Sequence, residues 1–229
     1  MALRKIRKGF VVWIGIAAVV GLGCGEFLRR RLNRLAYRLE ADPDSEETAE
    51  TDLPAPGRRW WIPLVLAAGW AGIVWASAPE TWSITESARL VSWLGFATIG
   101  LWLSAIDLDV QRLPDSGQLW LAAVTVVGGV VVDWDHPARL LVGLAAGCGC
   151  ALLFWLIHLF SRGGLGLGDV KLVATCAWWL GLFSLTAVYA AIGIGCLLGL
   201  AYSLVTRTRS FAFGPWLIAG TLVAGLVLV

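Results

Sequence analysis

Long apolar runs separated by short polar connections dominate the pattern of this chain. A run of about 17–25 apolar residues can cross a bilayer as an α-helix, which bonds its own backbone polar groups internally. We therefore predict an all-α fold, a polytopic transmembrane helix bundle of about eight spans. No stretch remains for a soluble domain, so residues 1–229 are expected to form one transmembrane domain. The spans are expected at 10–28, 60–78, 88–106, 117–132, 140–160, 171–184, 186–205 and 211–229.

One long polar connection, 29–59, interrupts the apolar pattern. It begins with five arginines between residues 29 and 38, turns acidic from Glu40, and passes through a Pro-containing stretch to Arg58 and Arg59. The basic part is expected to extend the first helix along the headgroups and to contact anionic membrane lipid. The acidic part is expected to be disordered, because it is charged and poor in apolar residues.

Positive charge predicts the orientation of the bundle, because Arg and Lys concentrate in cytoplasmic connections. Numbered from the first helix, the even connections carry only Arg89 and Arg139, and four basic residues between 4 and 8 favour the opposite orientation. The odd connections outweigh both groups, so we expect them to face the cytoplasm. They carry Arg29, Arg30, Arg31, Arg34, Arg38, Arg58, Arg59, Arg112, Arg162, Lys171, Arg207 and Arg209.

Composition supports a membrane protein. Of the 229 residues, 58% are apolar and 15% are charged, too few charges to cover the surface of a soluble domain of this size. The net charge of +2 gives no reason to expect a nucleic-acid partner. The five cysteines lie in apolar runs without a Cys-x-x-Cys pair, so we interpret them as packing residues and expect no metal site. The basic N-terminus and the apolar run after it look like a signal peptide, but further runs follow, and we expect a retained first helix.

The first acidic motif follows the third apolar run and reads DLDVQRLPDS over residues 107–116. Asp107 ends a long apolar helix, so its side chain is expected at the membrane boundary, facing the protein. Pro114 and Asp115 indicate a turn in which Asp115 caps the fourth helix by accepting its free backbone N–H groups. The competing interpretation of Asp107, Asp109 or Asp115, taken singly, is a solvated helix cap.

The second acidic motif reads GGLGLGDVKL over residues 163–172. Its glycines, which include Gly166 and Gly168, permit close backbone approach and positive φ, and they place Asp169 at the start of the sixth helix. Lys171 either neutralises Asp169, binds substrate or lipid headgroups, or is an ordinary cytoplasmic lysine. A phosphate-binding loop is disfavoured, because the motif follows a membrane helix and lacks the full nucleotide fingerprint.

Both motifs lie in odd connections and therefore on one side of the membrane. Two carboxylates that share a water cannot both ionise easily, so one is held protonated. The ionised carboxylate takes a proton from the water that attacks a peptide carbonyl, and the protonated one hydrogen-bonds the developing oxyanion. This chemistry makes Asp107 and Asp169 the candidate catalytic pair. The chain has no His-Glu-x-x-His and no Gly-x-Ser-x-Gly; His136 falls in an even connection, and His158 is expected to be a packing residue inside the fifth helix.

Together these segments resemble the prepilin leader peptidases, the GxGD-type aspartic membrane proteases. The family pattern of Asp followed some six residues later by Leu/Ile-Pro-Asp/Asn matches Asp107 with 113–115, and Gly-x-Gly-Asp-x-Lys-Leu matches 166–172. The stretch FAFGPWL at 211–217 is similar to the family's Pro-Phe-Gly-Pro-Phe-Leu. Near the start, GEFL at 25–28 with Asn33 and YRL at 37–39 is loosely similar to Gly-Ser-Phe-Leu-Asn…Tyr-Arg-Leu.

The resemblance implies that Asp107 and Asp169 are catalytic, and that Asp115 is a capping residue whose place also accepts Asn. It implies leader removal from type IV prepilin or type II secretion pseudopilin precursors, at the cytoplasmic face of the bacterial inner membrane. No cofactor is implied for the peptidase; S-adenosylmethionine is implied only if the family's N-methylation is retained. The family commonly carries two Cys-x-x-Cys pairs in its first cytoplasmic loop, whereas the 29–59 loop has none, and Glu26 replaces a small serine. We therefore expect a peptidase without zinc in this loop and leave methylation open.

Two other classes of function compete with the peptidase. Paired intramembrane carboxylates also form proton or cation sites in transporters, in which they lie near the midplane on facing helices. An inactive relative acting as a scaffold for pilus or secretion assembly is the other alternative. The presence of both aspartates and of Gly166 and Gly168 disfavours this scaffold role.

Overall fold

The computed structural model describes residues 8–39, 50–77, 83–161, 164–207 and 212–228. Over these residues the chain forms eight α-helices, one short 3₁₀ helix and no strand, so the predicted all-α bundle is confirmed. Each helix covers one predicted span, with ends shifted by up to four residues. The bounds are α1 Lys8–Leu32, η1 Glu50–Asp52, α2 Trp61–Ser77, α3 Ile84–Val110, α4 Asp115–Asp133, α5 Pro137–Phe160, α6 Leu167–Gly181, α7 Leu185–Thr206 and α8 Gly214–Leu228.

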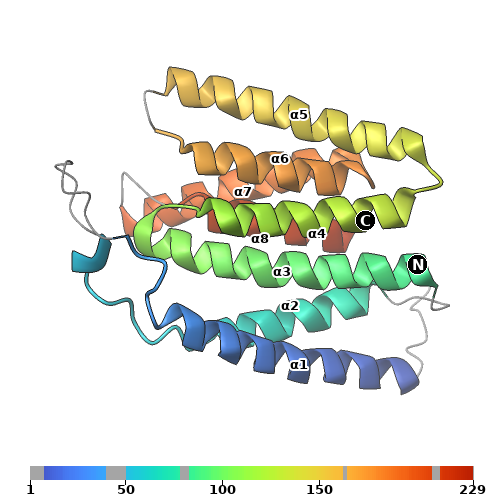
Figure 1. Ribbon diagram of the computed structural model, residues 1–229, viewed down its shortest axis with the longest axis horizontal. Helices are drawn as coiled ribbons and strands as arrows, with labels where there is room; N and C mark the ends of the chain where they lie inside the picture. Colours follow the sequence, from blue (N-terminus) through green and yellow to red (C-terminus); the bar gives the residue numbers. More distant parts are fainter. Residues whose placement is uncertain (1–7, 40–49, 78–82, 162–163, 208–211, 229) are drawn as a thin grey trace.

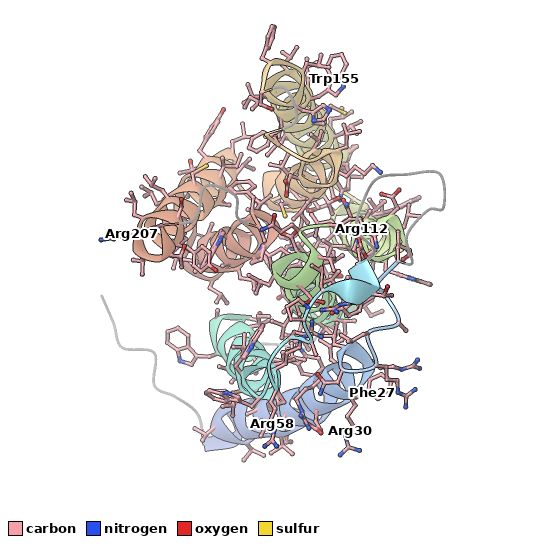
Figure 2. All side chains as sticks on the ribbon, turned by 90° about the vertical axis from the view of Figure 1, so that its left-hand side faces the viewer. Phe27, Arg30, Arg58, Arg112, Trp155 and Arg207 are labelled. Atoms are coloured by element: carbon pink, nitrogen blue, oxygen red, sulfur yellow. The ribbon has the colours of Figure 1, made fainter. Side chains whose placement is uncertain are left out.

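The helices run alternately up and down, so the odd connections share one end of the bundle, on the left of Figure 1. Figure 2 faces this end, with Arg30, Arg58, Arg112 and Arg207 labelled. By length and composition, α1 from Val11 onward, α3, α4, α5 and α7 are candidates to cross a membrane. The helices α2 and α8 are shorter and apolar, with 17 and 15 residues. The predicted gathering of both acidic motifs at one end is therefore correct.

The helices α3, α6 and α8 build the interior of the bundle. α3 packs against α1, α2, α4 and α8, while α6 packs against α4, α5, α7 and α8. Phe96 of α3, Trp179 of α6 and Leu217 of α8 are fully buried. The central place of α6 explains its 15-residue length, because surrounding helices rather than lipid cover much of it. This interior core supports the two helices that carry Asp107 and Asp169.

The 29–59 connection differs from its prediction. α1 ends at Leu32 rather than extending along the headgroups, Leu35 adopts a positive φ of 54°, and Arg38 turns inward with only 8% exposure. Residues 50–57 were predicted to be disordered, but they are fixed: Glu50 opens η1 and accepts hydrogen bonds from Arg112. The acidic stretch 40–49 lies outside the described residues, as do Arg4, Lys5, Arg7, Arg162 and Arg209.

Candidate active site

Asp107 lies in the last turn of α3 and is 4% exposed. One turn later Gln111 ends the helix in the left-handed conformation, with φ 50°, and its N–H donates to the carbonyl oxygen of Asp107 at 2.9 Å. The sequence prediction that Asp107 stands near the end of an apolar helix and faces the protein is confirmed. Because the backbone around it is fixed by this helix ending, the carboxyl group projects from a well-defined turn.

The Asp107 carboxylate is held by the beginning of α8. The N–H of Gly214 donates to Asp107 Oδ2 at 3.0 Å. Gly214 is the first residue of α8, where free N–H groups and the helix dipole favour a negative charge. Sequence reasoning assigned no role to this glycine. The available signal was the Gly214-Pro215 pair, since proline is favoured at the start of a helix and rarely inside one.

Asp169 lies in the first turn of α6 and is partly buried. Gly166 precedes this helix as its N-cap, with φ −72° and ψ 147°, and its carbonyl oxygen accepts the N–H of Asp169 at 3.1 Å. The predicted place of Asp169 at the start of the sixth helix is correct. Like Asp107, it is a carboxylate near a helix N-terminus.

Leu113 joins the two acidic motifs. A Cβ at Gly214 would meet Leu113 Cδ2 at 3.3 Å, and a Cβ at Gly168 would meet Leu113 Cβ at 3.0 Å. The same leucine therefore packs on the residue that bonds Asp107 and on the residue before Asp169. Through Leu113 the segment that holds Asp107 and the segment that carries Asp169 pack against each other. Asp107 and Asp169 are thus brought together at one end of the bundle, away from its midplane.

Of the glycines before Asp169, Gly168 serves close packing rather than an unusual backbone conformation. Gly164, Gly166 and Gly168 do not use the positive φ that glycine permits, since none of them has φ between +20° and +160°. Gly168 is needed because Leu113 and the Nε2 atom of buried Gln118 lie against it; Nε2 would be 3.3 Å from an added Cβ. At Gly166 the nearest atom, Asp169 Oδ2, would be 3.5 Å away, which is an ordinary contact.

The tight contact at Gly168 and the ordinary contact at Gly166 predict different losses of activity for the two alanine substitutions. Gly168→Ala is expected to lower activity at least about tenfold, because its Cβ pushes the Asp169 segment away from Leu113. Gly166→Ala is expected to lose no more than about threefold, since its added Cβ meets only an ordinary contact at 3.5 Å and the poorer N-cap acts on the helix rather than on the carboxylate. Both are checked by initial rates on a cleavable substrate at equal protein levels. Equal losses in the two variants would contradict the packing argument.

Pro114 is the N-cap of α4, and no side-chain hydrogen bond caps this helix. The prediction that Asp115 accepts the free N–H groups of the fourth helix is therefore wrong. Asp115 is the first residue of α4, and its Oδ1 accepts a hydrogen bond from Lys171 Nζ at 2.6 Å. Lys171 pairs with Asp115 rather than neutralising Asp169. The pair links the first motif to the second, but both side chains are more than half exposed, so its contribution to stability is small.

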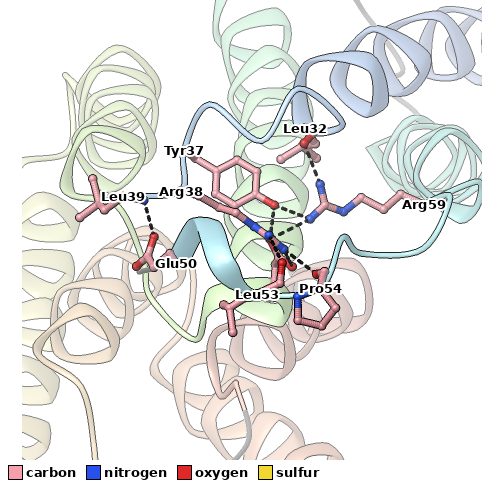
Figure 3. A network of polar contacts seen from close by, with 9 residues as sticks. Leu32, Tyr37, Arg38, Leu39, Glu50, Leu53, Pro54 and Arg59 are labelled. Atoms are coloured by element: carbon pink, nitrogen blue, oxygen red, sulfur yellow. Dashed lines mark hydrogen bonds and ion pairs between the residues drawn. The ribbon is translucent and has the colours of Figure 1, made fainter. Parts of the chain in front are cut away.

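Asp109 is a buried anion rather than the solvated cap that sequence reasoning favoured. Its carboxylate accepts hydrogen bonds from Tyr37 and Arg38 and forms an ion pair with Arg59 (Figure 3). The hydrogen bond to Asp109 raises the pKa of the Arg38 guanidinium, while burial raises the pKa of the Tyr37 hydroxyl. The sequence signal was the loosely matching YRL stretch at 37–39, whose partner in the first motif could not be inferred from spacing.

His158 has a structural partner, as expected, whereas the expected packing role fits only some of the cysteines: Cys176 is buried, but Cys148 and Cys196 are exposed. His158 Nδ1 lies 2.6 Å from the carbonyl oxygen of Leu165, which restrains the turn before α6; the residue is near the end of α5 rather than in its middle. All five cysteines are free thiols. Among the described residues, no three His, Cys, Asp or Glu side chains gather as a metal site would require. The absence of a metal stays a prediction.

Fold and site define a helical membrane protein whose two sequence motifs bring a pair of aspartates to one end of the bundle. The sequence model of the type IV leader peptidase family matches residues 94–204, which include both motifs. The chain is 32% identical over 173 residues to the prepilin leader peptidase/N-methyltransferase of Escherichia coli strain K12, covering 71% of this chain and 72% of that protein. The chain belongs to the type IV leader peptidase family.

Other relatives carry the same description. The prepilin leader peptidase/N-methyltransferase of Pectobacterium carotovorum is 26% identical over 279 aligned positions, which cover 95% of each chain. That of Neisseria gonorrhoeae is 35% identical over 121 residues, covering 49% of this chain and 40% of the relative. No solved structure matches the chain. The family assignment therefore rests on sequence, and the site geometry is that of this chain.

Proposed function

We propose that this chain is a membrane aspartic endopeptidase that removes the leader peptide of type IV prepilin or pseudopilin precursors. The observation that carries the proposal is the Asp107 carboxylate, buried at the end of α3 and bonded by Gly214, with Leu113 packed against both Gly214 and the Gly168 that precedes Asp169. Its membership of the leader peptidase family supplies the substrate class. The active end of the bundle faces the cytoplasm of the bacterial inner membrane, following the positive charges of the odd connections.

The mechanism uses the two aspartates as a unit. Two carboxylates near each other in a site of reduced dielectric share a proton, because a second charge would be repelled at short range. The ionised member draws a proton from a water molecule as the water attacks the scissile carbonyl. The protonated member hydrogen-bonds the developing oxyanion. When the intermediate collapses, the proton taken from the water passes to the leaving amine. The Gly214 N–H restrains Asp107 during these steps.

The peptidase acts without N-methylating its product in this proposal. Glu26 replaces the small serine of the family, and its carboxylate is already bound by two arginines of α1. Arg29 bonds both carboxylate oxygens at 2.7 Å, and Arg30 bonds Oε1 at 2.8 Å. Where the family has a small polar residue, this chain therefore has a carboxylate engaged by two arginines, and no step is routed through S-adenosylmethionine.

The test uses the purified full chain in detergent with a prepilin from the same genome. Leader removal is expected with or without a chelator, and mass spectrometry of the new N-terminus is expected to show no added methyl group when S-adenosylmethionine is supplied. Cleavage that yields a methylated product would refute the loss of methylation but keep the peptidase. Failure to cleave any prepilin of that genome would contradict the peptidase proposal itself.

A further inference from the structure

A buried cluster of charges fixes the end of α3 to the connection between α1 and α2. We call it the Asp109 cluster; it consists of Asp109 and the three residues bonded to it, Tyr37, Arg38 and Arg59, which Figure 3 labels. Asp109 is two residues beyond Asp107, and two residues turn an α-helix by about 200°. The two carboxylates therefore leave α3 on nearly opposite sides. Asp107 reaches α8, and Asp109 reaches the connection.

Arg38 makes the largest set of contacts in the Asp109 cluster. Its Nη2 lies 2.9 Å from Asp109 Oδ1 and its Nε lies 3.0 Å from Oδ2, the two-pronged geometry of a strong arginine–carboxylate pair. Its Nη1 donates to the carbonyl oxygen of Leu53 at 2.7 Å, and Nη2 also donates to that of Pro54 at 3.0 Å. The guanidinium thus holds the connection and α3 at the same time.

Arg59 adds the ends of two further helices. Its Nη1 donates to the carbonyl oxygen of Leu32, the last residue of α1, at 3.0 Å. Its Nη2 donates to the hydroxyl of Tyr37 at 2.5 Å and lies 3.4 Å from Asp109 Oδ2. Arg59 adopts a positive φ of 32°, a strained conformation for a residue with a side chain, two residues before α2 begins. The cluster therefore joins the ends of α1 and α3 and the start of α2.

Burial makes this cluster a geometric constraint. The side chains of Arg38, Arg59 and Asp109 are 3%, 5% and 7% exposed. Removing one partner of a buried, hydrogen-bonded charge network leaves a charge without compensation, so alternative placements of α3 are strongly disfavoured. A pair between the same segments that is closer to water, Arg112 with Glu50 at 2.9 Å, is 38% and 20% exposed and imposes less, because water can replace its partners in part.

We propose that Arg38 and Arg59 are positioning residues for the peptidase reaction. By holding Asp109, they fix the last turn of α3 and keep Asp107 in reach of both Gly214 and Asp169. The inference rests on the proposed function, because positioning has a consequence only if Asp107 is catalytic. It gives residues 37–38 a positioning role in the reaction, although they bond Asp109 and not one of the two proposed catalytic carboxylates.

The test compares Arg38→Gln and Asp109→Asn with the matched control Glu50→Gln. The control removes the half-buried ion pair that joins the same connection to Arg112, just beyond the end of α3. Arg38→Lys is included because lysine can pair with Asp109 but cannot also bond both carbonyl oxygens. Each full-length variant is assayed for kcat and KM on a prepilin, and hydrogen exchange of the backbone amides of residues 105–111 is followed by mass spectrometry.

Arg38→Gln and Asp109→Asn are expected to lower kcat at least about tenfold with KM nearly unchanged, since a small misplacement of a reacting group is costly. Amides of the last turn of α3 are expected to exchange faster, Arg38→Lys to retain more activity than Arg38→Gln, and Glu50→Gln to match the parent. The proposal is overturned if Arg38→Gln keeps the parent kcat, if Glu50→Gln loses as much, or if only KM changes.

Hydrogen exchange separates this proposal from the peptidase proposal. If the parent cleaves no prepilin, the proposed function fails, and faster exchange in Arg38→Gln still supports the restraint on the last turn of α3. Unchanged exchange in that variant overturns the restraint whatever the activity. Where Asp109→Asn does not accumulate as a folded protein, Arg38→Lys and Arg38→Gln provide the comparison.

Discussion

Replacing Asp107 or Asp169 by Asn is expected to lower the rate of leader cleavage at least about 1,000-fold, within the range that acid–base groups contribute to catalysis. Either substitution keeps the size and shape of the side chain but removes the ability to exchange a proton. Because the two aspartates act as a unit, the double variant should be little slower than either single variant. The Asp107 amide still has an oxygen to accept the Gly214 N–H, so the fold should be retained.

The matched control is Asp115→Asn. Asp115 belongs to the same motif as Asp107 but is exposed and pairs with Lys171, so its loss should leave cleavage within about threefold of the parent. The rate of leader removal is measured by gel shift for each variant. Thermal unfolding in detergent is measured alongside to check that each variant is folded. Cleavage that persists in Asp107→Asn or Asp169→Asn would exclude the two-aspartate mechanism. If Asp115→Asn lost as much cleavage activity as those two variants, Asp107 and Asp169 would not be singled out as the catalytic pair.

The sequence was sufficient for the elements and for the candidate pair because both depend on local, strong signals. A run of apolar residues has few alternatives to a helix in a membrane, so each of the eight helices was placed to within a few residues. Alternation of helices then puts all odd connections at one end. Asp107 and Asp169 could be placed together by this argument alone, without knowledge of any side-chain contact.

The hydrogen-bond and packing partners of the individual side chains could not be predicted, because several partners are possible for each and sequence patterns do not distinguish between them. Asp115 was predicted to bond its own helix, but the fold brings Lys171 of α6 within reach, and an ammonium group competes well for an exposed carboxylate. Asp109 was expected in water, but the 29–59 connection folds back over it with two arginines. Gly168, directly before Asp169, is explained by Leu113 and Gln118, which lie more than 45 residues away in the sequence.

Gly214→Ala is expected to reduce cleavage at least about 100-fold while changing the free energy of unfolding little. A Cβ at residue 214 would lie 2.8 Å from Asp107 Oδ2, so the carboxyl group must move. Moving the end of one side chain costs the fold little, and alanine is a better helix former than glycine at the start of α8. The same movement displaces a reacting oxygen, however, and small misplacements of catalytic groups cost about 100-fold in rate.

The control for this prediction is Gly193→Ala in α7, where an added Cβ meets no atom within 4 Å and should leave the rate unchanged. Both variants are compared with the parent by kcat, KM and thermal unfolding. A loss of kcat in Gly214→Ala, with its KM and unfolding temperature near those of the parent, would mean that the beginning of α8 sets the place of the Asp107 carboxylate. Full activity in Gly214→Ala would mean that the hydrogen bond from residue 214 to Asp107 is dispensable, and that the carboxylate finds its reacting position by other contacts.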